Sequence, residues 1–217
     1  MMVVYIILEI LAAYLLGSIP TAVWVGRMLY GIDIRQHGSG NAGATNVIRV
    51  LGYKAGIPVL LVDVFKGWLA VELAVWLPIH GQSSEMLTYI CIGMALAAVL
   101  GHVFPVYAGF KGGKGVGTVA GAGLALFPLA ILLVLAVFIV VLVATHFVSL
   151  SSIIASLAFP LVVWFVLGVR HPGLVGLSLL IAVFIPVTHS KNIKRLLSGE
   201  ERKFDFRRKK TTSDKLN

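Results

Sequence analysis

The stretch GVGTVAGAGLALFPLAILLVLAVFIVVLVATHF, residues 115–147, decides the fold that this sequence predicts. It contains no lysine, arginine, aspartate or glutamate, and it is longer than one membrane span, which needs about 20 apolar residues. Pro128 lies inside it, and proline interrupts a helix because it lacks an amide proton. We therefore expect a short, half-length, glycine-rich helix that ends near Phe127 and a longer helix that begins near Leu129.

The remainder of the chain is also apolar, since 59% of its 217 residues are hydrophobic and only 12% are charged. Soluble domains carry about 25% charged residues, so the composition indicates an integral membrane protein. Further apolar runs predict spans at about residues 2–25, 56–79, 86–107, 150–168 and 172–188. With the divided stretch these make seven spans, and we expect a single all-α domain over residues 1–217.

The distribution of basic residues predicts the orientation, because cytoplasmic loops are enriched in lysine and arginine. The first loop holds four of them, Arg27, Arg35, Arg49 and Lys54, whereas the link at residues 80–85 has none. Seven spans then place the N-terminus outside and the basic tail, residues 190–217, in the cytoplasm; six spans would leave that tail outside. Because ten of the 18 basic residues lie in this tail, the net charge of +9 indicates a membrane flank rather than nucleic-acid binding.

The loop FKGGKGVGT, residues 110–118, is the strongest indication of function. Glycines allow successive N–H groups to point into one concavity, and Lys111 and Lys114 supply positive charge, which suits a phosphate. It is not a nucleotide-triphosphate loop, because the glycine that the P-loop pattern requires is absent and Gly115 follows the lysine. The lysines could instead mark only a cytoplasmic flank, but a flank needs no glycine cluster, so we favour phosphate binding.

Two other segments carry polar side chains of suitable chemistry. GSGNAGATNVIR, residues 38–49, offers hydroxyls, amides and a guanidinium that can bind oxyanions, or it is a turn before a helix capped at Thr45 or Asn46. In the tail, His189 and Asn192 would share a helical face and could steer a hydroxyl or accept its proton, although for this segment alone an amphipathic interfacial helix is the better explanation. Both segments leave their alternatives open.

Two further observations concern buried ionisable residues and metals. Asp63 and Lys66 lie three apart in a predicted span, so we expect an ion pair facing the bundle interior. His102 is either a polar anchor near the lysine loop or an ordinary interfacial histidine. The single cysteine, Cys91, excludes a disulfide framework, and no spacing of histidines and carboxylates predicts a metal site.

Taken together, four motifs resemble those of the bacterial membrane acyl-phosphate:glycerol-3-phosphate acyltransferases. The motifs are residues 38–49, residues 101–118 from Gly101 and His102 through the lysine loop, Val148 to Ser152, and residues 189–199 with His189, Asn192 and Arg195. They occur in the right order over nearly the whole chain. Two positions depart from the family pattern: His146 replaces a basic residue, and Gly117 replaces alanine.

The resemblance implies a multi-pass enzyme of the bacterial cytoplasmic (inner) membrane with its active site at the cytoplasmic face. It would transfer a fatty acyl group from acyl phosphate to the sn-1 hydroxyl of glycerol 3-phosphate, giving lysophosphatidic acid and phosphate, without metal or cofactor. Its partners would be these two substrates, membrane lipids and a soluble enzyme that forms acyl phosphate. A transporter of phosphate or organophosphate is the alternative, and it predicts polar residues that continue to the outer face.

The resemblance also assigns roles to residues. The expected catalytic residues are Ser39, Arg49, Lys114, His189 and Asn192, and the expected substrate-binding residues are Asn41, Thr45, Lys111, Gly112, Gly113, Gly115 and Ser152. We expect Lys114 and the amides of residues 112–115 to hold acyl phosphate, and Arg49, Ser39, His189 and Asn192 to hold glycerol 3-phosphate. The hydroxyl proton would pass to His189 or to a substrate phosphate oxygen.

Overall fold

The computed structural model describes residues 2–77 and 82–206, and this part of the chain is helical and contains no strand. Its α-helices are α1 (Met2–Gly17), α2 (Thr21–Tyr30), α3 (Ala44–Leu51), α4 (Tyr53–Trp76), α5 (Ser84–Val103), α6 (Val116–Leu126), α7 (Pro128–Thr145), α8 (Val148–Leu161), α9 (Pro172–Thr188) and α10 (Ser190–Leu197). Short 3₁₀ turns lie at Ile34–Gln36 and Val106–Ala108, and a π-helical turn, Val162–Val166, continues α8. Residues 78–81, within the link between α4 and α5, and the basic tail beyond residue 206 lie outside the described residues.

The predicted break at Pro128 is confirmed, and a second break was not predicted. α6 ends at Leu126 and α7 begins at Pro128, where proline is tolerated because the first helical amide has no partner. The span predicted over residues 2–25 is instead two helices, α1 and α2, bent by 40°. Pro20, which has no amide proton, lies at this bend.

Three of the described helical segments are long and apolar enough to cross a membrane: Ser84–Ala108, Pro128–Thr145 and Val148–Val166. The count reaches five if the bent pairs α1–α2 and α9–α10 each form one span. α4 carries ionisable residues within its length, and α6 is apolar but only 11 residues long. The protein is therefore a multi-pass helical membrane protein.

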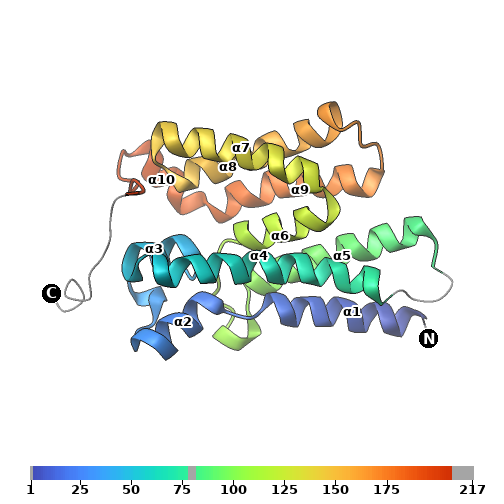
Figure 1. The fold of residues 1–217 in the computed structure, drawn as a ribbon, viewed down its shortest axis with the longest axis horizontal. Coiled ribbons are helices and arrows are strands. Elements are labelled where there is room, and N and C mark those ends of the chain that lie inside the picture. The colour runs from blue at the N-terminus through green and yellow to red at the C-terminus, as the bar shows by residue number, and fades with distance from the viewer. Residues whose placement is uncertain (1, 78–81, 207–217) are drawn as a thin grey trace.

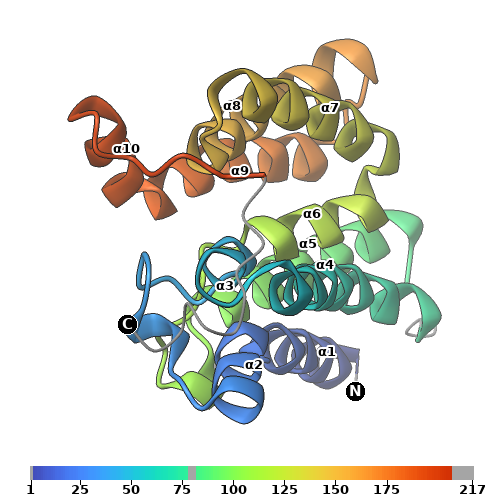
Figure 2. The same cartoon turned by 60° about the vertical axis from the view of Figure 1, so that its left-hand side comes forward.

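The helices form two groups, α1 to α6 and α7 to α10, connected through the α6–α7 turn (Figures 1 and 2). Within the first group α6 packs directly on α4, because glycines allow their backbones to touch. A Cβ atom on Gly67 would lie 2.1 Å from the Thr118 carbonyl oxygen, and one on Gly121 would lie 1.8 Å from that of Val64. This packing fixes the position of the lysine loop, which leads into α6.

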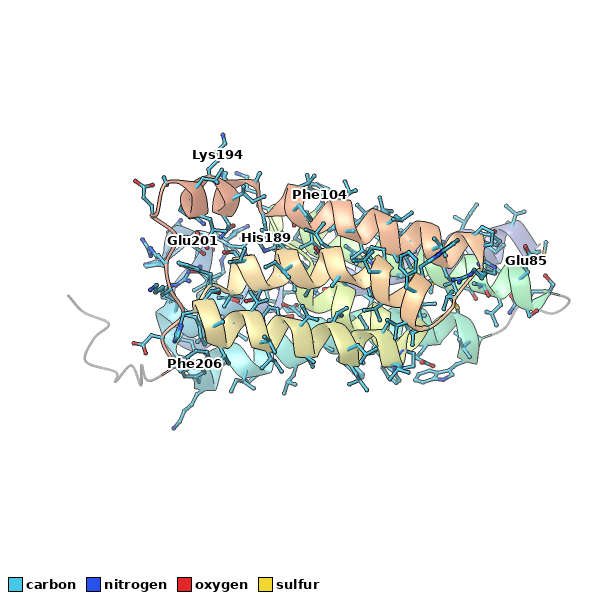
Figure 3. The ribbon with its side chains drawn as sticks, turned by 90° about the horizontal axis from the view of Figure 1, so that it is seen from above. Glu85, Phe104, His189, Lys194, Glu201 and Phe206 are labelled. Atoms are coloured by element: carbon cyan, nitrogen blue, oxygen red, sulfur yellow. The ribbon has the colours of Figure 1, made fainter. Side chains whose placement is uncertain are left out.

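The predicted polar segments gather toward one end of the bundle, which we call the α3–α10 end (Figure 1). α3, α10 and the C-terminal end of α7 lie there, and the N-terminus lies at the opposite end. Figure 3 shows the same separation, with His189 and Glu201 near one end and Glu85 near the other. The bundle therefore brings together residues that are far apart in the sequence.

Candidate active site at the α3–α10 end

The first polar loop is folded around the side chain of Asn46. This residue is 1% exposed, and its Oδ1 accepts a 2.8 Å hydrogen bond from the Ser39 amide. Its Nδ2 donates to three backbone carbonyls, those of Ile34 (3.1 Å), His37 (3.0 Å) and Asn41 (3.0 Å). A buried amide with such partners rigidifies its surroundings, so Asn46 is a structural support for Ser39 and Asn41.

The suggested helix cap at Thr45 or Asn46 is wrong. α3 begins at Ala44, and Gly43 precedes it without a capping side chain. Thr45 and Asn46 therefore do not cap the helix. Thr45 lies one turn before Arg49 on the same face of α3. Both expected site residues are therefore held on a short helix, next to the loop that carries Ser39.

An arginine that the sequence did not single out joins this loop to the lysine loop. Arg35 forms a two-pronged interaction with Asp33, with Nη2 to Oδ2 at 2.7 Å and Nε to Oδ1 at 3.0 Å. Its Nη1 donates to the carbonyls of Ala108 (2.8 Å) and Lys111 (3.4 Å). The two loops predicted to bind oxyanions are thus adjacent and fixed to each other.

The glycines of the lysine loop allow the loop backbone to pack closely against the end of α5. The amides of Gly112 and Gly113 donate to the carbonyls of Val103 (3.1 Å) and His102 (3.2 Å) at the end of α5. A Cβ on Gly113 would lie 2.2 Å from His102 Nε2. The expectation that the amides of residues 112–115 all face a phosphate is therefore wrong for two of them, and the candidate donors shift to residues 114–118 at the start of α6.

Directly beneath this loop lies a buried group of ionisable side chains, Asp63, Lys66 and His102, which we call the paired cluster. Lys66 Nζ is 2.8 Å from Asp63 Oδ1, His102 Nδ1 is 3.5 Å from the same oxygen, and the three residues are at most 7% exposed. Lys66 also donates to the Ile19 carbonyl, at the α1–α2 bend, over 2.8 Å. The predicted interior ion pair and the placement of His102 near the lysine loop are confirmed.

Lys114 connects the lysine loop to the C-terminal segment. Its Nζ donates a hydrogen bond to Asn192 Oδ1 across 78 residues of sequence. Asn192 is 6% exposed, and its Nδ2 donates to Glu201 Oε1 over 2.7 Å. The structure thus brings together Lys114 and Asn192, two of the expected catalytic residues.

Glu201 is a central member of this network that sequence reasoning missed. It accepts hydrogen bonds from Ser149 Oγ (2.7 Å) and Arg195 Nε (2.8 Å) as well as from Asn192. Burial is the largest influence and would raise the pKa of Glu201, but these hydrogen bonds together hold the pKa below its ordinary value. The sequence signal for it was only the adjacent glutamates Glu200 and Glu201 within the otherwise basic tail.

His189 lies between α9 and α10, one turn before Asn192, and is 3% exposed. Its Nδ1 lies 2.8 Å from the Ile185 carbonyl oxygen, which can only accept, so Nδ1 carries the proton. In the neutral ring Nε2 is then the acceptor, as a group that receives a hydroxyl proton must be.

Cations exceed anions at the α3–α10 end. Burial, followed by repulsion from Arg202, lowers the pKa of Arg49, and Arg49 makes no hydrogen bond or ion pair within the part of the chain that the structure describes. Burial also lowers the pKa of Lys114 to about 8, with Arg195 and Arg49 adding repulsion against the attraction of Glu201. Arg49 lies close enough to Lys114 to repel it, and we call these two residues the cationic surface. Glu201 pairs with Arg195.

Ser152 does not join this network in the described structure. It is 4% exposed, and its hydroxyl donates to the Val148 carbonyl of its own helix over 2.9 Å. Ser149, one turn earlier, makes the contact to Glu201. Within residues 2–77 and 82–206, no group of three His, Cys, Asp or Glu side chains is arranged to hold a metal ion.

An apolar pocket of about 240 Å³ extends between α5, α6 and α9. Its lining comprises Ala95, Leu96, Val99, Leu100, Val119, Ala122, Gly123, Leu126, Phe127, Leu177, Leu180, Ile181 and Phe184. Gly115, the residue after Lys114, borders this lining: a Cβ there would lie 3.3 Å from Val99 and 3.4 Å from Phe184. The pocket thus begins next to the lysine of the cationic surface.

Comparisons with known proteins identify the family of this chain. The family model described as glycerol-3-phosphate acyltransferase matches residues 7–199. A protein named glycerol-3-phosphate acyltransferase from Chlorobaculum parvum is 42% identical over 92% of this chain and 97% of its own length. One of the same name from Trichlorobacter lovleyi is 47% identical over 90% of this chain and 95% of its own length.

Solved structures give the same result. The glycerol 3-phosphate form of PlsY, described as an integral membrane glycerol 3-phosphate acyltransferase, has a TM-score of 0.81 and 39% identity, covering 93% of this chain and 96% of that chain. Its lysophosphatidic acid form has a TM-score of 0.78 at the same identity and coverage. The family resemblance found in the four motifs is confirmed, and this chain belongs to the glycerol-3-phosphate acyltransferase family.

Proposed function

We propose that this enzyme transfers a fatty acyl group from acyl phosphate to the sn-1 hydroxyl of glycerol 3-phosphate, giving lysophosphatidic acid and inorganic phosphate. The observation that carries the proposal is the cationic surface beside the apolar pocket. Both substrates are phosphates, so their reacting groups approach only if positive charge neutralises the two anions. An acyl phosphate also needs an apolar site for its tail next to the site for its phosphate.

The proposed roles follow from this geometry. Lys114 and the N–H groups at the start of α6 hold the phosphate of acyl phosphate, and Lys111 contributes charge from the loop. Arg49 binds the phosphate of glycerol 3-phosphate, with Ser39, Asn41 and Thr45 contributing hydroxyls and amides. Gly112, Gly113 and Gly115 allow the close approach of the loop, and Ser152 is retained as a predicted substrate contact.

The chemical step is a direct acyl transfer. The sn-1 oxygen attacks the carbonyl carbon of acyl phosphate, a new ester C–O bond forms, and the bond from that carbon to the phosphate oxygen breaks. The hydroxyl proton passes to His189 Nε2 or to the departing phosphate, while Asn192 orients the hydroxyl and holds Lys114. Since phosphate is already a good leaving group, alignment can supply much of the rate, up to about 7–11 kcal/mol.

We further propose seven spans in the bacterial cytoplasmic membrane, with the N-terminus outside and the α3–α10 end at the cytoplasmic face. The two additional spans are α4, whose buried Asp63 and Lys66 form an ion pair, and the half-length α6. The excess of lysine and arginine at that end supports the orientation. A soluble enzyme could then deliver acyl phosphate from the same compartment, and no cofactor or metal is required.

The test is to incubate the purified protein in detergent with glycerol 3-phosphate and one acyl donor. Parallel reactions use acyl phosphate, acyl-CoA or acylated acyl carrier protein as that donor. We expect lysophosphatidic acid and one equivalent of phosphate only with acyl phosphate. Equal product from acyl-CoA would contradict the proposed donor, and no product from any donor would contradict acyl transfer. A transporter would instead move glycerol 3-phosphate into vesicles without forming product.

A further inference from the structure

Phe127 is the last residue that the α6 side contributes to the lining of the apolar pocket. One face of α6 lines the pocket with Val119, Ala122, Gly123 and Leu126, which recur at helical spacing, and Phe127 follows directly. Phe127 is 4% exposed and packs edge-on against Phe159, which is 2% exposed, with ring centroids 5.3 Å apart. At Phe127 the chain passes from α6 into α7, the turn that connects the two helix groups (Figure 2).

The opposite end of the pocket lies at the phosphate-binding loop. Gly115 borders Val99 and Phe184 in the pocket lining, and Lys114 directly precedes it. A tail attached to a phosphate held by Lys114 would therefore enter here and run along α6 toward Phe127. Leu100 and Leu180, which also line the pocket, are 46% and 48% exposed, so the tail can enter sideways from surrounding lipid.

Building on the proposed function, we propose that Phe127 determines the length of the acyl chain that this enzyme transfers. The path from Gly115 to Phe127 is 12 helical steps, about 18 Å at 1.5 Å per residue. An extended alkyl chain with C–C bonds of about 1.5 Å advances about 1.3 Å per carbon, so this path holds about 14 carbons, a myristoyl chain.

The physical chemistry of the membrane predicts an asymmetric length preference. A chain shorter than the path loses little, because its tail exchanges one apolar surrounding for another. A longer chain must press against the buried Phe127–Phe159 pair, and forcing an extra methylene into a packed core is unfavourable. We expect kcat/KM to change little up to myristoyl and to fall about fivefold or more for each added methylene pair beyond it.

The test measures kcat/KM for saturated acyl phosphates from lauroyl to arachidoyl at a fixed glycerol 3-phosphate concentration. Phe127→Ala should move the steep fall to longer chains, and Phe127→Leu, which disturbs packing less, should move it in the same direction by a smaller amount. Ala122→Leu narrows the pocket partway along and should move the fall to shorter chains. The matched control is Phe165→Ala, because Phe165 is 75% exposed and does not line the pocket.

The outcomes separate this inference from the function on which it rests. An unchanged length profile in Phe127→Ala and Phe127→Leu, with acyl transfer intact, would overturn the role of Phe127 alone. The same applies if Phe165→Ala moves the profile as much as Phe127→Ala does. If the unaltered enzyme forms no product from any acyl phosphate, the proposed donor fails and the chain-length role fails with it.

Discussion

Two charged regions of this bundle lie one above the other and differ in how their charges are balanced. In the paired cluster, the carboxylate of Asp63 meets the ammonium of Lys66, and His102 lies against the same oxygen. On the cationic surface, Arg49 has no hydrogen-bonded partner within the described residues, and Lys114 contacts only an amide oxygen. The charges of the paired cluster neutralise each other and support the fold. The cations of the cationic surface are not paired with a carboxylate of the described residues, so they are available to bind an anionic substrate.

The largest effect should come from breaking the paired cluster on one side only. Asp63→Asn leaves the Lys66 ammonium buried without a counter-charge, so we expect a loss of about 3–5 kcal/mol in the free energy of unfolding. The double variant Asp63→Leu with Lys66→Met removes both charges and should lose far less. Unfolding of the purified protein in detergent measures both, and equal losses would contradict the assignment of this region as a closed ion pair.

The next largest effect should come from the cationic surface. Lys114→Ala removes a cation aimed at developing phosphate charge and should lower kcat/KM about 10²–10³-fold without lowering the unfolding temperature. The matched control is Lys194→Ala, since Lys194 is an exposed lysine that points away from the bundle on α10 (Figure 3). Comparable losses in both variants would mean that general positive charge, rather than Lys114, matters.

The pH dependence of kcat/KM tests whether the charge on Lys114 is needed for activity. Because burial lowers the pKa of Lys114 to about 8, the free enzyme should lose its ammonium as the pH rises through about 8, and kcat/KM should decline there. Lys114→Arg, which stays charged, should retain some activity and lack this decline. A decline at the same pH in Lys114→Arg would assign it to another group.

The smallest effect separates two neighbouring serines. Ser149→Ala removes a hydrogen bond to the Glu201 carboxylate, so the Glu201–Asn192 contact should loosen and the KM for glycerol 3-phosphate should rise about threefold or more. Ser152→Ala removes a bond only to its own helix and should change KM less. The reverse order in steady-state kinetics would mean that Ser152 contributes more to substrate binding than the Ser149–Glu201 hydrogen bond does.

Features set by local sequence were predictable. The break at Pro128 follows from one residue type, and the Asp63–Lys66 pair follows from helical spacing. Glycine, asparagine and lysine composition was enough to select the loops that form the candidate site.

Other features depend on contacts between residues distant in the chain. The sequence suggested Asn46 as a helix cap, but in the folded protein its side-chain amide forms hydrogen bonds with four backbone groups of the preceding segment. Glu201 and Arg35 are ordinary charged residues in the sequence and acquire their roles only where loops meet. The amides of Gly112 and Gly113 seemed free, because the sequence does not reveal that the end of α5 accepts from them.

The central claim is that cations from distant segments act on the same pair of phosphates, and a double-mutant cycle tests it most directly. We would measure kcat/KM for Arg49→Ala, Lys114→Ala and the combination, with Lys194→Ala plus Lys114→Ala as the reference pair. The account predicts that Arg49 and Lys114 are coupled by about 1 kcal/mol or more, while Lys194 and Lys114 are additive. Additive losses for Arg49 and Lys114 would contradict a shared site.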